Sequence, residues 1–518
     1  MPIDRRTLIK VAAGAVGAAI SGSSTPVAAK DDIRGRMIID TSREIGRIPA
    51  SYTGFSVELA TLADPEIYHP ANASMIALYR RLSRQGVLRI GGNSSEFCWW
   101  KPKADSAPPT IRAAGVGRAD NWMPQRLIPI SPAAVDNLRG FLDATGWSCI
   151  YGLNFGTGSP EADAEQAAYV AHVLGPTLRY FQIGNEPDFY QDPNNLLRPR
   201  GWGFEDYLRE WTQIANAVSA AVPGARFGGP DVGSSADWVV RFGERAKPLL
   251  GERLIELTGH YYAEGPPDSP DANIDHLLTR DPRIEPRMAA IMPVARQQGL
   301  SFRMAEGNSC FRGGKPGMSN ALAGALWGMD YMLEMATLGC SGINFHGGSG
   351  NVISMSLGNK LPGARNARDL EIARLGSFYS PIAGNREVGY TARPLYYGML
   401  AVDAFAETTL LATDLDSGGP NVTAYAGRGV KGWRVAVVNK DRYRDVSLEL
   451  PSPPFGSGRI WRLSGPALDA TTGISLAGAE LRTAEPLWEP STHETLSVKQ
   501  GRAVIRVPHA SAAVLIGA

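Results

Sequence analysis

The chain lacks the charge imbalance that nucleic-acid-binding and membrane-surface proteins carry. Its 52 lysines and arginines are matched by 51 aspartates and glutamates, so the net charge is +1, and no block of like charges stands out. A basic patch or stripe is the electrostatic footprint of nucleic-acid recognition. The composition therefore argues against nucleic acid or an anionic membrane as partner. Hydrophobic residues at 44% and charged residues at 20% are typical of a globular protein.

Cysteine and histidine are also scarce. The four cysteines, at positions 98, 149, 310 and 340, show no C-x-x-C spacing, so a zinc or redox motif is not expected. Small buried thiols are the simplest interpretation, and one disulfide stays open for an exported protein. His260 and His346 lack the paired spacing of metal-dependent hydrolases. We therefore expect neither a metal nor another cofactor.

No segment is apolar over the roughly 20 residues that a membrane anchor needs. The N-terminus instead has the layout of an export signal. Arg5 and Arg6 precede a stretch rich in Ala, Val and Gly from Val11 to Ile20, and Val27-Ala28-Ala29 offers small residues for cleavage. The paired arginines predict a twin-arginine-type signal peptide over residues 1–29 and a periplasmic or secreted protein without a membrane anchor.

Short strand-like runs alternate with longer helical patterns between residues 50 and 395. Val87–Ile90, Cys149–Asn154 and Phe302–Glu306 are examples of the strand-like runs. Such alternation predicts a parallel sheet. We count eight strands in this region, which predicts an α/β fold with a (β/α)8 TIM barrel over residues 50–395.

The pattern changes after about residue 410. Short alternating runs such as Asn421–Tyr425, Trp433–Val438 and Val446–Leu450 are separated by Gly, Pro and Ser. This pattern is typical of an antiparallel sandwich. Met37–Pro49 also reads as a strand. We therefore predict a C-terminal antiparallel β-sandwich domain built from residues 30–49 plus 396–518. The oligomeric state is left open.

Polar residues end all eight predicted barrel strands, and barrel enzymes place their active sites at these ends. The polar strand-end residues include Glu58, Arg89, Asn154, Glu186, Asp231, His260, Tyr262, Glu306 and His346. Glu186 and Glu306 end strands four and seven, which lie on opposite sides of the ring. Their carboxylates should face each other. Two facing carboxylates predict glycoside hydrolysis, in which one protonates the leaving oxygen and the other attacks the anomeric carbon or activates water.

These motifs resemble glycoside hydrolase family 79, the β-glucuronidases and heparanases of clan A. The stretches that carry the resemblance are Leu88–Asn93, Gln182–Pro187, His260–Tyr262, Glu306–Ser309 with Gly313-Gly314, Ser341–Gly348 and Ala392–Met399. Together they span the barrel. The resemblance implies a retaining, exo-acting β-glycoside hydrolase, most specifically a β-glucuronidase. It implies Glu186 as acid/base and Glu306 as nucleophile, although the residues alone do not decide between chain ends and internal bonds.

The resemblance also implies residues around the sugar. Asn185 is expected to bind the 2-hydroxyl, and Glu58 is expected to hold further hydroxyls or to be a structural carboxylate. Tyr262 and His346 are expected in the same mouth. Gly313 matches the loop that receives the uronate carboxylate, where a residue without Cβ lets the backbone approach closely.

One departure from the family pattern leaves the sugar open. Phe311 stands where glucuronidases carry a tyrosine that touches the carboxylate, and phenylalanine cannot donate a hydrogen bond. Arg312 could supply a charge-assisted one. The carbohydrate substrate could be a glucuronide, a methylated glucuronide or a neutral hexoside. The alternatives are a β-glucosidase or disaccharide-releasing β-glycosidase of the same clan, or a non-catalytic carbohydrate-binding barrel.

Overall fold

The computed structural model describes residues 33–110, 127–192, 197–358, 360–481 and 488–518. The predicted signal peptide, residues 1–29, lies outside these residues. Within the described ranges, no helix has both the length and the apolar composition needed to cross a membrane.

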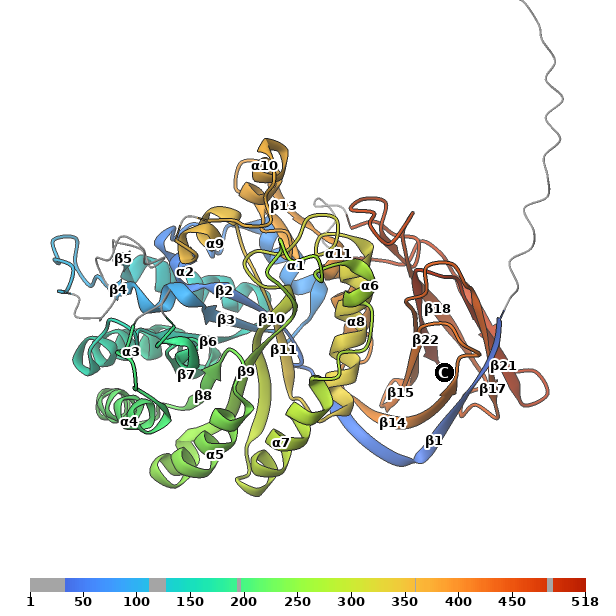
Figure 1. Cartoon of the computed structure of the whole chain (residues 1–518), viewed down its shortest axis with the longest axis horizontal. Helices are drawn as coiled ribbons and strands as arrows, with labels where there is room; N and C mark the ends of the chain where they lie inside the picture. Colours follow the sequence, from blue (N-terminus) through green and yellow to red (C-terminus); the bar gives the residue numbers. More distant parts are fainter. Residues whose placement is uncertain (1–32, 111–126, 193–196, 359, 482–487) are drawn as a thin grey trace, which may run out of the picture. The chain divides into compact units, whose positions relative to one another are not determined.

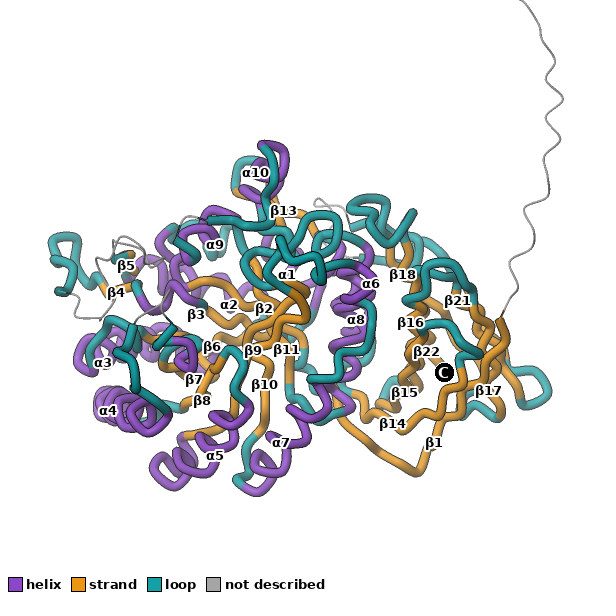
Figure 2. Tube along the Cα trace, in the orientation of Figure 1, coloured by secondary structure: helices purple, strands orange, loops and turns teal. Residues whose placement is uncertain are grey.

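Eight parallel strands close into a barrel (Figures 1 and 2). They are β2 (Thr53–Glu58), β3 (Val87–Gly91), β6 (Ser148–Leu153), β7 (Leu178–Ile183), β8 (Phe227–Val232), β9 (Leu254–Glu264), β10 (Ser301–Cys310) and β11 (Gly342–Gly347). Around the ring the order follows the chain. Almost every residue of these strands is buried, because helices cover the outer face of a parallel barrel. The predicted (β/α)8 barrel is confirmed.

Helices follow the strands and surround the barrel in Figure 2. They are α1 (Ala73–Leu82), α2 (Pro132–Thr145), α3 (Pro160–Leu174), α4 (Phe204–Ala221), α5 (Ala236–Leu250), α6 (Ile274–Leu277), α7 (Ile284–Gln297), α8 (Leu322–Thr337), α9 (Gly350–Ser356), α10 (Ala367–Leu375) and α11 (Pro394–Asp403). Short 3-10 helices lie in the loops: η1 (Leu59–Ala63), η2 (Asn93–Glu96), η3 (Gly175–Thr177), η4 (Pro187–Phe189) and η5 (Gly251–Arg253). The loops also hold two small strand pairs, β4 (Cys98–Trp100) with β5 (Ile128–Ile130) and β12 (Ile382–Asn385) with β13 (Gly389–Ala392).

Helix α2 illustrates how the local sequence sets one unit of the barrel. Pro132 occupies its first turn, where a missing N–H costs nothing, and Gly146 ends it in the left-handed region at φ 77°. The next residue, Trp147, enters the core. Its ring stacks on Phe55 at 5.3 Å, and its Nε1–H donates to the Ser83 carbonyl at 2.9 Å.

Apart from the two small strand pairs, the strands outside the barrel form one sheet of ten strands. Its members are β1 (Ile33–Ile48), β14 (Thr408–Asp416), β15 (Val422–Gly429), β16 (Gly432–Asn439), β17 (Val446–Pro451), β18 (Ser457–Ser464), β19 (Ser475–Leu476), β20 (Glu494–Ser497), β21 (Arg502–Val507) and β22 (Ser511–Gly517). The sheet is antiparallel except that β1 pairs with β17 in parallel. It encloses its own core, which includes Met37, Val437 and Leu448. A C-terminal β-sheet domain beside the barrel is therefore confirmed.

A buried ion pair joins helix α8 to this sheet. The Asp330 carboxylate accepts hydrogen bonds from Lys440 Nζ at 2.5 Å, Thr423 Oγ1 at 2.5 Å and Tyr425 OH at 2.7 Å. The Lys440 side chain is only 3% exposed. A charge this buried is tolerated because each partner is neutralised and hydrogen-bonded.

Replacing Asp330 by alanine should lower the free energy of unfolding by about 3–5 kcal/mol, because it leaves the Lys440 charge buried and unpaired. Urea denaturation measures this change. The matched control is Asp143→Ala, which removes the exposed i,i+4 partner of Arg139 on α2 and should change stability by less than about 0.5 kcal/mol. Equal effects of the two substitutions would contradict the proposed role of the buried pair.

Candidate active site

A cavity of about 910 Å3 opens where the barrel strands end. Seven residues singled out from the sequence line it, namely Glu58, Glu186, Tyr262, Glu306, Phe311, Arg312 and His346. They come from β2, β9, β10, β11 and the turns after β7 and β10. The carboxyl ends of the strands thus converge on one concave site, the usual location of an active site in this fold.

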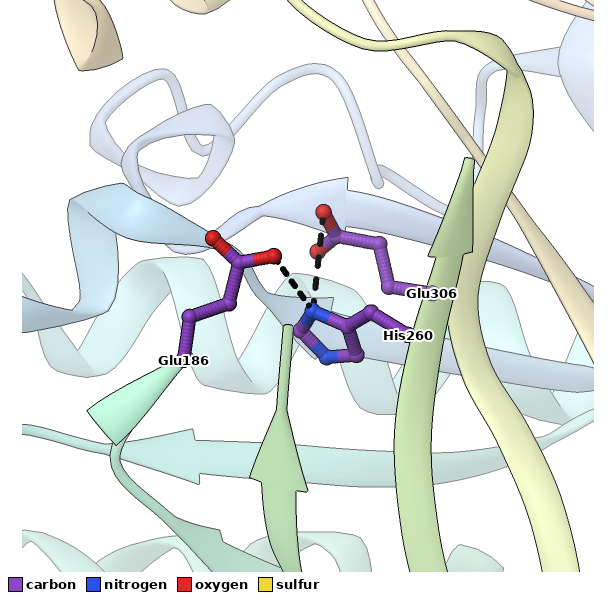
Figure 3. A group of neighbouring side chains, drawn as sticks. All are labelled: Glu186, His260 and Glu306. Atoms are coloured by element: carbon purple, nitrogen blue, oxygen red, sulfur yellow. Dashed lines mark hydrogen bonds and ion pairs between the residues drawn. The ribbon is translucent and has the colours of Figure 1, made fainter. Parts of the chain in front are cut away.

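Two glutamates face each other in this cavity, with a histidine between them (Figure 3). Nδ1 of His260 lies 3.0 Å from Oε1 of Glu186 and 4.0 Å from Oε1 of Glu306. One oxygen of each carboxylate and the histidine nitrogen all lie within 4.8 Å of one another. Strands four and seven therefore bring their carboxylates into close range.

The backbone at Glu186 is strained. Its φ of 49° and ψ of 50° place it in the left-handed region, which non-glycine residues seldom adopt and which costs about 1–3 kcal/mol. Asp231, at φ 60°, is in the same region. The Glu186 N–H donates to the Asp231 carbonyl at 2.9 Å, which holds the two turns together. The turn directs the Glu186 side chain toward His260 (Figure 3).

Arg89 is fully buried beside Glu306. Its guanidinium donates to the side chains of Ser56, Gln182, Asn185, Asp231 and Glu306. The bond from Nη1 to Glu306 Oε2 is 2.6 Å long, and the bond from Nη2 to Asn185 Oδ1 is 2.7 Å long. All five N–H groups of the guanidinium therefore have acceptors. Arg89 therefore ties the ends of four strands, β2, β7, β8 and β10, to one fixed charge.

Burial and neighbouring charges separate the pKa values of the two glutamates. Burial raises the pKa of Glu186, the Glu306 charge raises it further, and His260 only partly opposes this. Burial also disfavours the charged form of Glu306, but His346, His260 and Arg89 outweigh it and lower the pKa of Glu306 to about 2. Glu186 is thus suited to keep a proton, and Glu306 to stay ionised.

His260 is held in its charged form. Burial disfavours the imidazolium, but Asp231 and Glu306 outweigh burial and raise the pKa of His260 to about 10. Nε2 lies 3.1 Å from Asp231 Oδ1, an ion-pair contact that is poorly aligned for a hydrogen bond. Nδ1–H then donates to Glu186 Oε1. A protonated Glu186 accepts this bond through its carbonyl oxygen, which leaves the acidic O–H free.

The remaining wall of the site surrounds Glu306. Tyr262 OH donates to Glu306 Oε1 at 2.8 Å. His346 reaches three partners, with Ser56 Oγ at 3.0 Å and carboxylate oxygens of Glu58 and Glu306 each at 3.5 Å. Glu58 is itself only 3% exposed. A row of acceptors and donors therefore lines the side of the cavity opposite Glu186.

Comparison with known proteins finds relatives that are glycoside hydrolases. The chain is 26% identical to a β-glucuronidase of Aspergillus niger over an alignment of 563 positions, gaps included, which covers 96% of this chain and 97% of that protein. It is 22% identical over 339 residues to heparanase of Bos taurus, covering 58% and 61%. The chain belongs to glycoside hydrolase family 79.

The fold of this glycoside hydrolase also matches solved structures. A 4-O-α-L-rhamnosyl-β-D-glucuronidase from Fusarium oxysporum superposes with a TM-score of 0.69 at 17% identity, covering 93% of this chain and all of that chain. An arabinofuranosidase from Xanthomonas axonopodis gives a TM-score of 0.59 at 15% identity. No model in a scan of protein families matches the chain.

Two residues expected at the sugar, Gly313 and Asn185, do not line this cavity in the family 79 chain. Gly313 is buried, does not line the cavity, and has Leu361 Cδ1 only 2.7 Å from where a Cβ would lie. The Asn185 side chain is 2% exposed and donates to Asn93 Oδ1 at 3.0 Å. Arg312 is exposed at the rim, with its guanidinium 5.7 Å from the Phe311 ring.

Sequence reasoning missed two residues of the site. Tyr379 lines the cavity, with its ring 6.2 Å from Tyr262 and 5.9 Å from His346. It lies between α10 and β12, away from any barrel-strand end. Glu96 is 2% exposed and accepts the backbone N–H of Asn185 at 2.7 Å and that of Gly156. It lies on η2, so the strand-end pattern gave no signal for it.

Glu186, His260 and Glu306 also form the one group, among the described residues, whose ligand atoms lie close enough to hold a metal ion. A divalent cation there would lie beside the His260 imidazolium and the Arg89 guanidinium, which already neutralise Glu306. That repulsion makes the group better suited to proton transfer than to metal binding.

Replacing Glu96 by glutamine should lower kcat/KM on an aryl β-glycoside about tenfold, an effect of about 1.4 kcal/mol. One carboxylate oxygen would become an NH2 group facing a backbone N–H, so the turn that presents Glu186 would loosen. Ser95→Ala is the control, because it removes a hydroxyl that donates to Glu96 and to the Gly92 carbonyl but leaves both backbone N–H contacts of Glu96. Wild-type kinetics for Glu96→Gln would show that the carboxylate does not position the turn.

Proposed function

We propose that this protein is a retaining β-glucuronidase in which Glu306 is the nucleophile and Glu186 the acid/base. The observation that carries the proposal is the short range between the two carboxylates. Retaining enzymes hold them about 5–5.5 Å apart, whereas inverting enzymes hold them about 6.5–9.5 Å apart to admit a water molecule. Glu186 and Glu306 have oxygens within 4.8 Å, which supports the retaining geometry.

In the first step, a carboxylate oxygen of Glu306 forms a bond to the anomeric carbon while the glycosidic C–O bond breaks. Glu186 gives its proton to the departing oxygen. Arg89 and Tyr262 hold Glu306 ionised and fixed. The product is a glycosyl ester of Glu306 and a free alcohol or phenol.

In the second step, a water molecule attacks the anomeric carbon and the ester bond to Glu306 breaks. Glu186, now ionised, takes a proton from that water. The exchange of roles follows from the electrostatics, because the Glu306 charge raises the pKa of Glu186 and esterification removes that charge. The acid of the first step thereby becomes the base of the second.

Glucuronide as substrate is supported by the Aspergillus niger relative, which covers nearly the whole chain, and by cationic groups at the cavity. Arg283, Arg287, Arg312 and Lys360 line it. Arg312 is exposed, directly follows Phe311 in the chain and has its guanidinium 5.7 Å from the Phe311 ring, so we assign it the uronate carboxylate in place of the buried Gly313 loop. A neutral β-hexoside is the second candidate, and Phe311 is the observation that favours it. We also propose export through the N-terminal signal, on the strength of Arg5-Arg6.

Exchanging each glutamate separately distinguishes the two roles. Glu306→Ala should lower kcat/KM roughly 10⁴-fold or more on every substrate, because no nucleophile remains. Glu186→Ala should cost about 10²–10⁴-fold on poor leaving groups and far less on dinitrophenolate, which needs little protonation. Steady-state kinetics on a glucuronide with a poor leaving group and on dinitrophenyl β-glucuronide checks this. NMR of the released sugar should show the β-anomer first. An initial α-anomer would contradict the retaining mechanism.

The pH dependence of kcat/KM should change when the His260 charge is removed. Activity needs a protonated Glu186, so kcat/KM falls as pH rises through its raised pKa. His260 lowers that pKa. His260→Asn should therefore move the alkaline limb to higher pH as well as reduce the maximum. His276→Asn, which removes a 61% exposed partner of Glu264, is the control and should leave the profile in place. An unmoved limb in His260→Asn would refute the assignment of Glu186 as acid.

The Arg312 assignment predicts a selective effect on binding. Arg312→Ala should raise KM for nitrophenyl β-glucuronide more than for nitrophenyl β-glucoside, since only the glucuronide has a carboxylate to lose. Parallel kinetics on the two substrates measures it. A wild-type preference for the glucoside by tenfold or more, about 1.4 kcal/mol in barrier, would instead favour the neutral hexoside.

A further inference from the structure

One exposed aromatic side chain, that of Phe189, lines the cavity on the side of Glu186. Phe189 is 39% exposed, lines the cavity and lies three residues after Glu186, at the end of η4. The other aromatic side chains that line the cavity within the described residues are buried or half-buried. A single exposed phenylalanine needs no explanation on an ordinary surface. Beside a catalytic carboxylate it is a preformed apolar contact.

The Phe189 ring is held in place. Its neighbour Asp188 accepts hydrogen bonds from the backbone N–H groups of Gly233 at 2.8 Å and Ser234 at 3.0 Å, which fixes η4 to the loop after β8. A Cβ at Gly233 would lie 2.2 Å from the Phe189 ring and 3.0 Å from Glu186 Oε1. Gly233 thus lies against both groups, and its lack of a side chain lets ring and carboxylate share one wall.

The sugar and the leaving group must occupy opposite sides of the two glutamates. Glu58, His346 and Tyr262 gather around Glu306 and offer polar contacts for a sugar. The leaving group must lie where Glu186 delivers its proton, which is the side of Phe189 and Gly233. Aromatic side chains bind aryl rings and the C–H faces of pyranose rings by dispersion and burial.

We propose that Phe189, backed by Gly233, is the platform of the leaving-group subsite, on which the first ring of the aglycone stacks. The substrate class is then a β-glucuronide whose leaving group begins with a pyranose or aryl ring. The proposal rests on the proposed function, because it takes Glu186 as the group that protonates the leaving oxygen.

Two substrates that share the sugar and differ in the leaving group isolate the platform. Nitrophenyl β-glucuronide has a ring for Phe189 to contact, and β-glucuronyl fluoride has none. For both, kcat/KM reports the step in which the bond to Glu306 forms and the leaving group departs. Phe189→Ala should lower kcat/KM on the nitrophenyl substrate about tenfold and leave that of the fluoride within about twofold of wild type, since the sugar contacts are unchanged.

Phe189→Tyr should restore the nitrophenyl rate, because it keeps the ring. Tyr443→Ala, which removes a 71% exposed aromatic side chain in the sheet domain, should change neither rate. An equal fall on both substrates in Phe189→Ala, or no fall on either, would overturn the platform. No turnover of either glucuronide by the wild type would overturn the proposed function itself, and the platform with it.

Discussion

The active site depends on one buried cation, the guanidinium of Arg89. It contacts Glu306 and Asp231 with charge-assisted bonds and places all its N–H groups on acceptors. A buried charge is tolerated only when it is paired and fully hydrogen-bonded. Because its partners come from four strands and their ends, β2, β7, β8 and β10, the requirement to satisfy Arg89 also fixes where these strands end. Removing it would take the main counter-charge from Asp231 and one of three counter-charges from Glu306.

Charge balance around Arg89 then assigns the proton of Glu186. Two buried cations, Arg89 and His260, face two ionised carboxylates, Asp231 and Glu306, whose pKa values are both lowered. The cluster is neutral without a charge on Glu186. A third carboxylate charge in the same buried space would exceed these two cations, so burial and the Glu306 charge raise the pKa of Glu186 and His260 only partly opposes them. The same electrostatics that keeps the nucleophile charged keeps the acid protonated, and it reverses when Glu306 becomes an ester.

The sequence was sufficient to predict those site residues that lie at the ends of barrel strands. Strand ends of a barrel meet at one face, so Glu58, Glu186, Glu306 and His346 could be brought together from the alternation of strands and helices alone. Glu96 and Tyr379 lie on a 3-10 helix and a long connection, where no periodicity reports direction. The burial of Gly313 depends on Leu361, which is distant in sequence. The parallel pairing of β1 with β17 likewise depends on a contact between the two ends of the chain.

The central claim is that Glu306, ionised beside Arg89, forms a covalent bond to the sugar. A 2-deoxy-2-fluoro-glucuronyl fluoride tests it directly, since the 2-fluorine slows both steps and the fluoride leaving group keeps the first step fast enough for the glycosyl ester to accumulate. Peptide mass spectrometry after brief incubation should find the fluorosugar attached to Glu306, and dilution into an acceptor should restore activity. A label on Glu186, or turnover of glucuronides by an enzyme that never becomes labelled, would contradict the account.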